Sequence, residues 1–175
     1  MKDAGDRKLL LDACVLIDYF KEDREVLRAA ARSLGEIIIP SPVLLEVRTA
    51  SITDCEELGL TVFQPELRII TAASQRRGGL SLQDRICLLI ASELQATVYS
   101  NDKPLITAAS VAGVRAEWGL KLLLELAAAG EITVGHALVV ANRICSRSSY
   151  LSRALQIFRS EVQRIFPEHE TEDFL

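Results

Sequence analysis

Short runs of apolar residues that stop at polar positions recur along the first part of the chain. Residues 9–12, 36–40 and 97–100 each hold three or more consecutive apolar or β-branched side chains. Uninterrupted runs of this length are typical of parallel strands that are buried on both faces, whereas half-exposed strands alternate apolar and polar residues. The pattern therefore predicts three buried strands, with Asp12 at the end of the first and Ser100 at the end of the third.

Helical spacing separates these runs. Residues 26–34 place their apolar side chains on one side of a helix that Gly35 ends. Ser41 followed by Pro42 predicts a helix start with Ser41 as the cap. Ser81 and Asp84 form a Ser-x-x-Asp capping box, which predicts a helix that runs to about residue 94. Residues 60–63 read as a short edge strand, and 67–74 as a helix before the break at Gly78-Gly79.

Alternation of strands and helices predicts an α/β fold. A parallel sheet with right-handed crossovers and helices on both faces makes a three-layer α/β/α domain. From Trp118 to Phe166 the pattern is almost entirely helical, with breaks at Gly130 and around 146–149. We expect one domain over 1–166, with a core at about 7–118, a helical C-terminal extension at about 119–166, and a polar tail at 167–175.

Composition narrows the class of protein. A chain of 175 residues with 49% hydrophobic composition can bury one good core. The first 20 residues carry charges on both sides of a short apolar run, so neither a signal peptide nor a membrane span is expected, and the location is expected to be cytoplasmic. A net charge of −4 argues against a protein that coats nucleic acid through a basic surface, but not against an enzyme that holds cations at an acidic centre.

The four cysteines do not form a recognisable metal or disulfide framework. They are far apart in the chain, without a CxxC pair or a histidine at ligand spacing, and we expect them to be reduced and mostly packed in the core: Cys14, Cys55, Cys87 and Cys145.

Four carboxylates fall where a parallel sheet collects its ligands. Asp12 ends one predicted strand and Asp102 follows another, and ligands of open α/β sheets bind at the carboxyl ends of strands. Glu46 lies about two helical turns after the cap at Ser41, and Asp84 lies in the first turn of its helix. Because carboxylates repel one another unless a cation neutralises them, and Mg²⁺ and Mn²⁺ prefer oxygen ligands, the set indicates a metal site.

Each acid also has a structural explanation. Asp12 and Asp102 could cap the helices that follow them, Asp84 completes its capping box, and Glu46 could be a solvated helical residue. The functional interpretation depends on all four acids together. They recur at corresponding ends of consecutive strand–helix units, and four such acids arise by coincidence less often than one.

The acids and their surroundings resemble the PIN-domain family, which includes the ribonuclease toxins of VapBC toxin–antitoxin pairs. The resemblance spans nearly the whole chain, and the part beyond Trp118 is similar to an extended subgroup of PIN-like proteins. The matching segments are residues 10–17 (LLDACVLI), 40–46 (PSPVLLE), 82–85 (LQDR) with 90–91, and 99–105 (YSNDKPL).

The resemblance implies a metal-dependent ribonuclease. Asp12, Glu46, Asp84 and Asp102 would bind one or two Mg²⁺ or Mn²⁺ ions and catalyse hydrolysis of RNA phosphodiester bonds, with Ser100 and Asn101 as supporting groups. Such an ion lowers the pKa of a bound water, and a carboxylate helps to deprotonate it. The family also implies RNA as substrate, and an antitoxin protein and a homodimer as partners.

Basic residues beside the acids are candidates for phosphate contacts. Arg48, Arg85 and Lys103 are adjacent to the proposed ligands, and each could equally be a solvated charge. A second group could form a basic stripe that holds RNA, or a solvated face interleaved with Glu161 and serines. Its members are Arg143, Arg147, Arg153, Arg159 and Arg164.

Other function classes have specific requirements. The glycine-rich signatures GxxxxGK[ST] and GxGxxG are absent, which argues against nucleotide binding through a phosphate loop. A phospho-acceptor receiver module needs an adjacent acid pair after the first strand, but Ala13 follows Asp12. The remaining alternative is a non-catalytic PIN-like interaction module that acts through protein or RNA binding, for which the apolar helices around 122–126 and 137–141 could pack a partner.

Overall fold

A computed structural model of the protein describes residues 7–75, 78–147 and 151–168. Its Cα trace divides into two compact units, Met1–Gly119 and Leu120–Leu175. Residues 169–175 of the expected polar tail lie outside the described residues.

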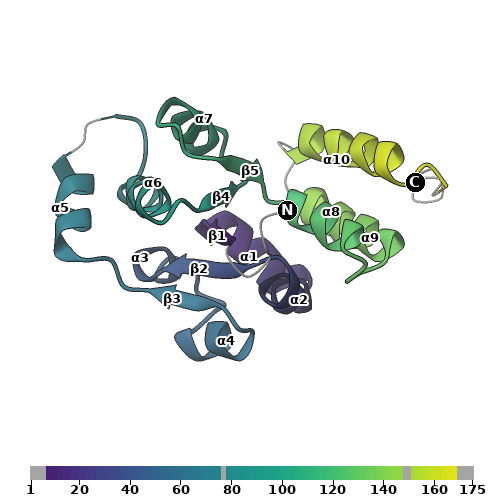
Figure 1. The fold of residues 1–175 in the computed structure, drawn as a ribbon, viewed down its shortest axis with the longest axis horizontal. Coiled ribbons are helices and arrows are strands. Elements are labelled where there is room, and N and C mark those ends of the chain that lie inside the picture. Colours follow the sequence, from purple (N-terminus) through teal and green to yellow (C-terminus); the bar gives the residue numbers. More distant parts are fainter. Residues whose placement is uncertain (1–6, 76–77, 148–150, 169–175) are drawn as a thin grey trace. The chain divides into compact units, whose positions relative to one another are not determined.

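A five-stranded, all-parallel sheet lies at the centre of the first unit, in the order β3-β2-β1-β4-β5 (Figure 1). The central strands are almost completely buried, as the uninterrupted apolar runs require, and the predicted α/β class with helices on both faces is confirmed. The strands are β1 Lys8–Leu11, β2 Glu36–Pro40, β3 Thr61–Phe63, β4 Thr97–Ser100 and β5 Ala116–Trp118.

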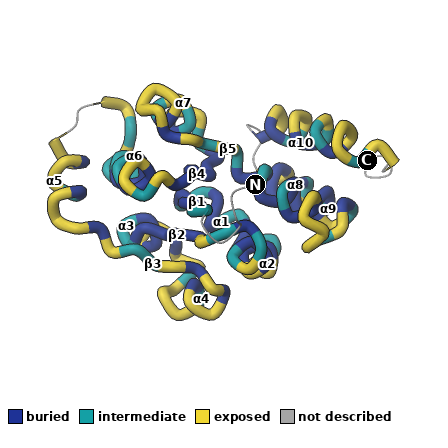
Figure 2. Tube along the Cα trace, viewed as in Figure 1, coloured by how far each residue is buried: buried dark blue, intermediate teal, exposed yellow. Residues whose placement is uncertain are grey.

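Helices cover both faces of this sheet. Leu10 and Val98 lie in a buried cluster with residues of α3, α5, α6 and α7, so this face is covered by those helices. Successive side chains of a strand point to opposite faces, so Leu9 and Leu11 face the other side, where α1 and α2 pack (Figures 1 and 2). The helices of the unit are α1 Ala13–Glu22, α2 Glu25–Ser33, α3 Ser41–Leu44, α4 Ile52–Glu57, α5 Leu67–Gln75, α6 Leu82–Leu94 and α7 Lys103–Val111.

Three local predictions are wrong. Trp118 was expected to begin the helical part of the chain, but it ends β5, which pairs with β4. Ser41 was expected to cap a helix, but Pro40 occupies the cap position and the Ser41 hydroxyl bonds Gln64 Oε1 at 2.7 Å. That helix was expected to carry Glu46, but it ends at Leu44 because the backbone tightens there to bonds between residues three apart.

The second unit contains three helices, α8 Lys121–Ala128, α9 Val134–Ser146 and α10 Ser152–Ile165. Each of the three packs against the other two. Gly130 has a φ of 75°, a conformation that favours glycine, and it ends α8 at the expected break. The apolar segments 122–126 and 137–141 are largely buried in the folded chain. Among the described residues, no helix is both long and apolar enough to cross a membrane.

Candidate functional site

The strand order places a switch point between β1 and β4. From β1 the chain crosses to β2, which pairs with β1 on one side. Later it returns to β4, which pairs with β1 on its other side (Figure 1). Open α/β sheets bind ligands at this point, beyond the carboxyl ends of the two strands. Asp12 follows β1 and Ser100 ends β4, and the backbone N–H of Asp12 donates to the Tyr99 carbonyl at 3.2 Å.

Asp12 is a buried carboxylate with several donors around it. Its side chain is the cap of α1, since Oδ1 accepts the Val15 N–H at 3.0 Å, and the Ser100 hydroxyl donates to Oδ2. The Cys14 thiol lies 2.9 Å from Oδ1 and 3.1 Å from Oδ2. Burial nevertheless raises the pKa of Asp12 above its usual value, because these bonds offset only part of the desolvation, and the charge of Asp84 raises it further.

Asp84 is held by the helix that carries it. The predicted capping box is present: the Asp84 N–H donates to the Ser81 hydroxyl at 3.0 Å, and the Ser81 N–H donates to Asp84 Oδ2 at 3.1 Å. Because α6 runs back across the sheet before β4, its first turn lies at the carboxyl edge. One carboxylate thereby has two effects, since it closes a helix end and adds negative charge beside Asp12.

Glu46 reaches the same group of charges from an exposed turn after α3. Partial burial of its carboxylate is the largest cause of a raised pKa, and the charges of Asp84 and then Asp12 contribute as well. The structure therefore brings Asp12, Glu46 and Asp84 close enough for their charges to interact. Glu46 was expected on a helix, but it lies in a turn.

Asp102 joins this group through its backbone. Its N–H donates to the Ser100 hydroxyl at 2.9 Å, and that hydroxyl in turn donates to Asp12. It occupies the cap position of α7, but its carboxylate makes no cap bond. The charges of Asp12, Glu46 and Asp84 interact with one another, but the carboxylate of Asp102 is not among the charges that raise the pKa of Asp12 or Glu46.

Two cysteines belong to the site, a point that sequence reasoning missed. Cys14, expected in the core, is only partly buried and lies against Asp12, and burial together with the Asp12 charge raises the pKa of its thiol. Cys87 lies one helical turn after Asp84 and is buried, and its thiol pKa is raised by burial and by the charges of all three acids. The spacing of three residues between Asp84 and Cys87 was the available signal for Cys87, whereas the spacing of two between Asp12 and Cys14 gave none. All four cysteines are free, as expected.

A second network, also missed, fixes the end of β4. The amide nitrogen of Asn101 donates to Asp18 of α1 at 2.8 Å, and its amide oxygen accepts the Gly119 N–H at 3.1 Å. Gly119 also accepts a bond from the Tyr19 hydroxyl at 2.8 Å. The Asn101 amide therefore bonds Asp18 and Gly119, while the Ser100 hydroxyl bonds Asp12 directly.

The adjacent basic residues differ in their surroundings. Arg48 and Lys103 are exposed. Arg85 is partly buried, and its Nε is the one buried side-chain nitrogen or oxygen in the described residues that has no hydrogen-bond partner. A buried donor without a partner costs free energy on the order of 1–3 kcal/mol, so a hydrogen-bond acceptor at this Nε would stabilise the fold.

The donors suit a hard cation by their chemistry. Asp12, Glu46 and Asp84 offer carboxylate oxygens, and none of the three forms an ion pair with a described residue. In the described ranges, however, no three His, Cys, Asp or Glu side chains are close enough together to hold a metal ion, so the three carboxylates would have to come closer together to share one. No protein-family model matches the chain, and no curated protein matches its sequence.

Proposed function

We propose that the protein is an endoribonuclease of PIN type that depends on a divalent metal ion and hydrolyses RNA phosphodiester bonds. The observation that carries the proposal is the set of three interacting carboxylates at the switch point of the sheet: burial raises the pKa values of Asp12 and Glu46, and the charge of Asp84 raises both further. A fold that buries mutually repelling charges loses stability, and a cation is the simplest way to recover it.

Asp12, Glu46 and Asp84 would hold Mg²⁺ or Mn²⁺, with Asp102 as a fourth acid within reach of the same strand end. A bound ion would supply Lewis acidity and a water of lowered pKa at this position. Ser100 orients the Asp12 carboxylate, and Ser81 orients that of Asp84. Asn101 fixes the turn that joins β4 to α7, through Asp18 and Gly119.

Arg85 supports a phosphodiester as the substrate. It follows Asp84 directly in the first turn of α6, and no described residue accepts a bond from its buried Nε. Guanidinium groups bind phosphate oxygens with well-defined geometry, so Arg85 would position the scissile phosphate, with the exposed Arg48 and Lys103 as further contacts. The resemblance to toxins adds an antitoxin protein, a homodimer and a cytoplasmic location to the proposal.

The alternative is a non-catalytic PIN-like interaction module. The observation that favours it is the structural role of two acids, since Asp12 caps α1 and Asp84 completes the capping box of α6. Under this alternative both carboxylates would be retained for helix stability alone. It does not account for the position of Glu46, which caps no helix and whose pKa is raised by burial and also by the charges of Asp84 and Asp12.

RNA cleavage with and without metal separates the two functions. A labelled single-stranded RNA is incubated with wild type in Mn²⁺, in Mg²⁺ and in EDTA, and with Asp84→Asn in Mn²⁺. Asparagine can still accept the Ser81 N–H, so the helix cap is kept while the charge is lost. We expect cleavage by wild type in metal only. Equal cleavage by Asp84→Asn, or none by wild type under any condition, would reject the nuclease proposal.

A further inference from the structure

Positive charge is concentrated in one segment of an otherwise acidic chain. Residues 143–164 contain five of the 20 Lys and Arg residues but one of the 24 Asp and Glu residues, while the whole chain has a net charge of −4. That single acid, Glu161, is ion-paired with Lys121 of α8 at 3.3 Å. The arginines of this segment are therefore not neutralised by the acid within it.

Helix α10 presents Arg153 and Arg164 on the side away from its packed face. Ala154, Phe158 and Val162 are buried. Arg153 and Arg164 are both exposed and stand eleven residues apart, which is about three helical turns, so they share one face. Neither takes part in an ion pair with a described residue.

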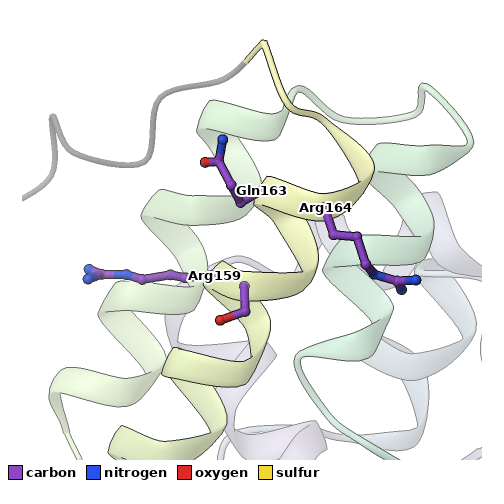
Figure 3. A pocket seen from close by; sticks show the side chains of 4 residues that line it. Arg159, Gln163 and Arg164 are labelled. Atoms are coloured by element: carbon purple, nitrogen blue, oxygen red, sulfur yellow. The ribbon is translucent and has the colours of Figure 1, made fainter.

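Between these turns the surface is hollowed. Figure 3 shows the hollow, of about 500 Å³, with Arg159 and Arg164 extending on opposite sides of the helix and Gln163 above them; Ser160 completes the lining. Arg159 is fixed by a bond from Nη2 to Asn142 Oδ1 of α9 at 2.7 Å. Because asparagine is neutral, the bond orients the guanidinium and leaves its charge available.

We propose that this exposed side of α10, formed by Arg153 and Arg164 with Ser160 and Gln163 and bordered by Arg159, binds the phosphodiester backbone of single-stranded RNA. The identity of the polyanion rests on the proposed function, whereas the surface itself rests on α10. Arginine forks match phosphate oxygens, and serine and glutamine add neutral hydrogen bonds to phosphate and sugar.

The same face indicates which part of RNA is recognised. The aromatic residue of α10, Phe158, is buried, so the described face offers no ring on which a base could stack. Binding should therefore follow the backbone, with little dependence on base sequence.

Binding without catalysis tests this surface. Fluorescence polarisation of a labelled single-stranded RNA is measured in EDTA over a series of KCl concentrations, so that no metal chemistry contributes. Three phosphate contacts predict a slope of log affinity against log salt of about −2. The double variant Arg153→Gln, Arg164→Gln should bind about tenfold more weakly at physiological salt, with a slope reduced in magnitude by about 1.4. Arg115→Gln, an exposed arginine of the first unit, is the matched control.

The outcomes separate this proposal from the nuclease proposal. Weaker binding by the double variant, with wild-type affinity in Arg115→Gln and in RNAs of different sequence, supports the surface even if no RNA is ever cut. Equal losses in the double variant and Arg115→Gln would overturn it, because the effect would then be one of net charge. Binding of phosphatidylserine vesicles but not RNA through the same arginines would also overturn it.

Discussion

The two charged regions of the protein are built in opposite ways. At the sheet edge, Asp12 is buried and Asp84 is partly buried, and both are held by hydrogen bonds that the backbone topology determines. On α10 the charges are mostly positive, and Arg153 and Arg164 are exposed and placed on one side by helical spacing. Desolvated charges interact strongly and tolerate little displacement, whereas exposed charges are screened by salt. The first arrangement suits chemistry at a fixed point, and the second suits adjustable contact with a flexible polyanion.

The largest expected difference concerns cleavage. Asp12→Asn or Asp84→Asn should lower the rate of RNA cleavage at saturating RNA by a factor of about 10² or more, because either change removes a proposed metal ligand and proton acceptor. Arg153→Gln with Arg164→Gln should leave that rate within about threefold while raising KM. Steady-state kinetics in Mn²⁺ measure both. If the cleavage rate at saturating RNA fell as much in the arginine variant as in the acid variants, the assignment of catalysis to the acids and of RNA binding to α10 would be wrong.

The next largest effect concerns packing beside the acids. A Cβ added in Gly119→Ala would lie 2.7 Å from Val15 Cγ2 and 2.9 Å from Asn101 Oδ1, so Asn101 must move. We expect a loss of about 1–3 kcal/mol in the free energy of unfolding. Gly135→Ala on α9 meets nothing within 4 Å and should gain about 0.5–1 kcal/mol. Urea denaturation measures the free energy of unfolding of both variants. An equal effect of the two substitutions would show that the close contact between Gly119 and Asn101 does not matter for stability.

A smaller effect separates the two capping boxes of the first unit. Ser81→Ala and Ser51→Ala each remove one helix cap and should each cost about 1 kcal/mol. Only the Ser81 hydroxyl positions a helix turn that carries a proposed metal ligand, because it accepts the Asp84 N–H at 3.0 Å, while the Ser51 hydroxyl accepts the Asp54 N–H at 3.1 Å. Mn²⁺ affinity should therefore weaken in Ser81→Ala and stay at the wild-type value in Ser51→Ala. The same affinity in both would place Asp84 outside the metal site.

The smallest effect is a pH dependence of the metal-free protein. Because the pKa of Asp12 is raised in the fold, its carboxyl is protonated more readily when folded than when unfolded. Its favourable contribution is complete below the ordinary value of 3.8 and is lost as pH rises through the raised pKa. In EDTA, the Tm of wild type should fall relative to that of Asp12→Asn as pH increases over this window. A rise would contradict the burial of an unneutralised charge.

Sequence reasoning was most successful where a signal extended over several residues. The buried strands β1, β2 and β4 followed from uninterrupted apolar runs, and the start of α6 followed from Ser81 and Asp84. Of the two strands with three residues, β3 was predicted at 60–63, whereas β5 was missed because it is stabilised by its pairing with β4. Helix α4 begins with the same Ser-x-x-Asp signature as α6, but its apolar spacing over six residues is too short to indicate a helix.

Contacts between distant segments account for what the sequence did not show at the site. Asp18 and Asn101 are 83 residues apart, and only the folded topology brings α1 to the end of β4. Glu46 was assigned to a helix because Ser41-Pro42 is a valid start, yet nothing in the apolar pattern marked the early end of α3 at Leu44. Its approach to Asp12 and Asp84 depends on that turn.

Calorimetric titration of Mn²⁺ into the metal-free protein tests the central claim most directly. Wild type and the double variant Asp12→Asn, Asp84→Asn are compared, with thermal unfolding recorded for each. The account predicts saturable binding to wild type and an increase in unfolding free energy of about 2.7 kcal/mol when Mn²⁺ is a hundredfold above its Kd, with neither effect in the variant. Absence of binding to folded wild type, or equal binding to the variant, would contradict a metal centre at the carboxyl ends of β1 and β4.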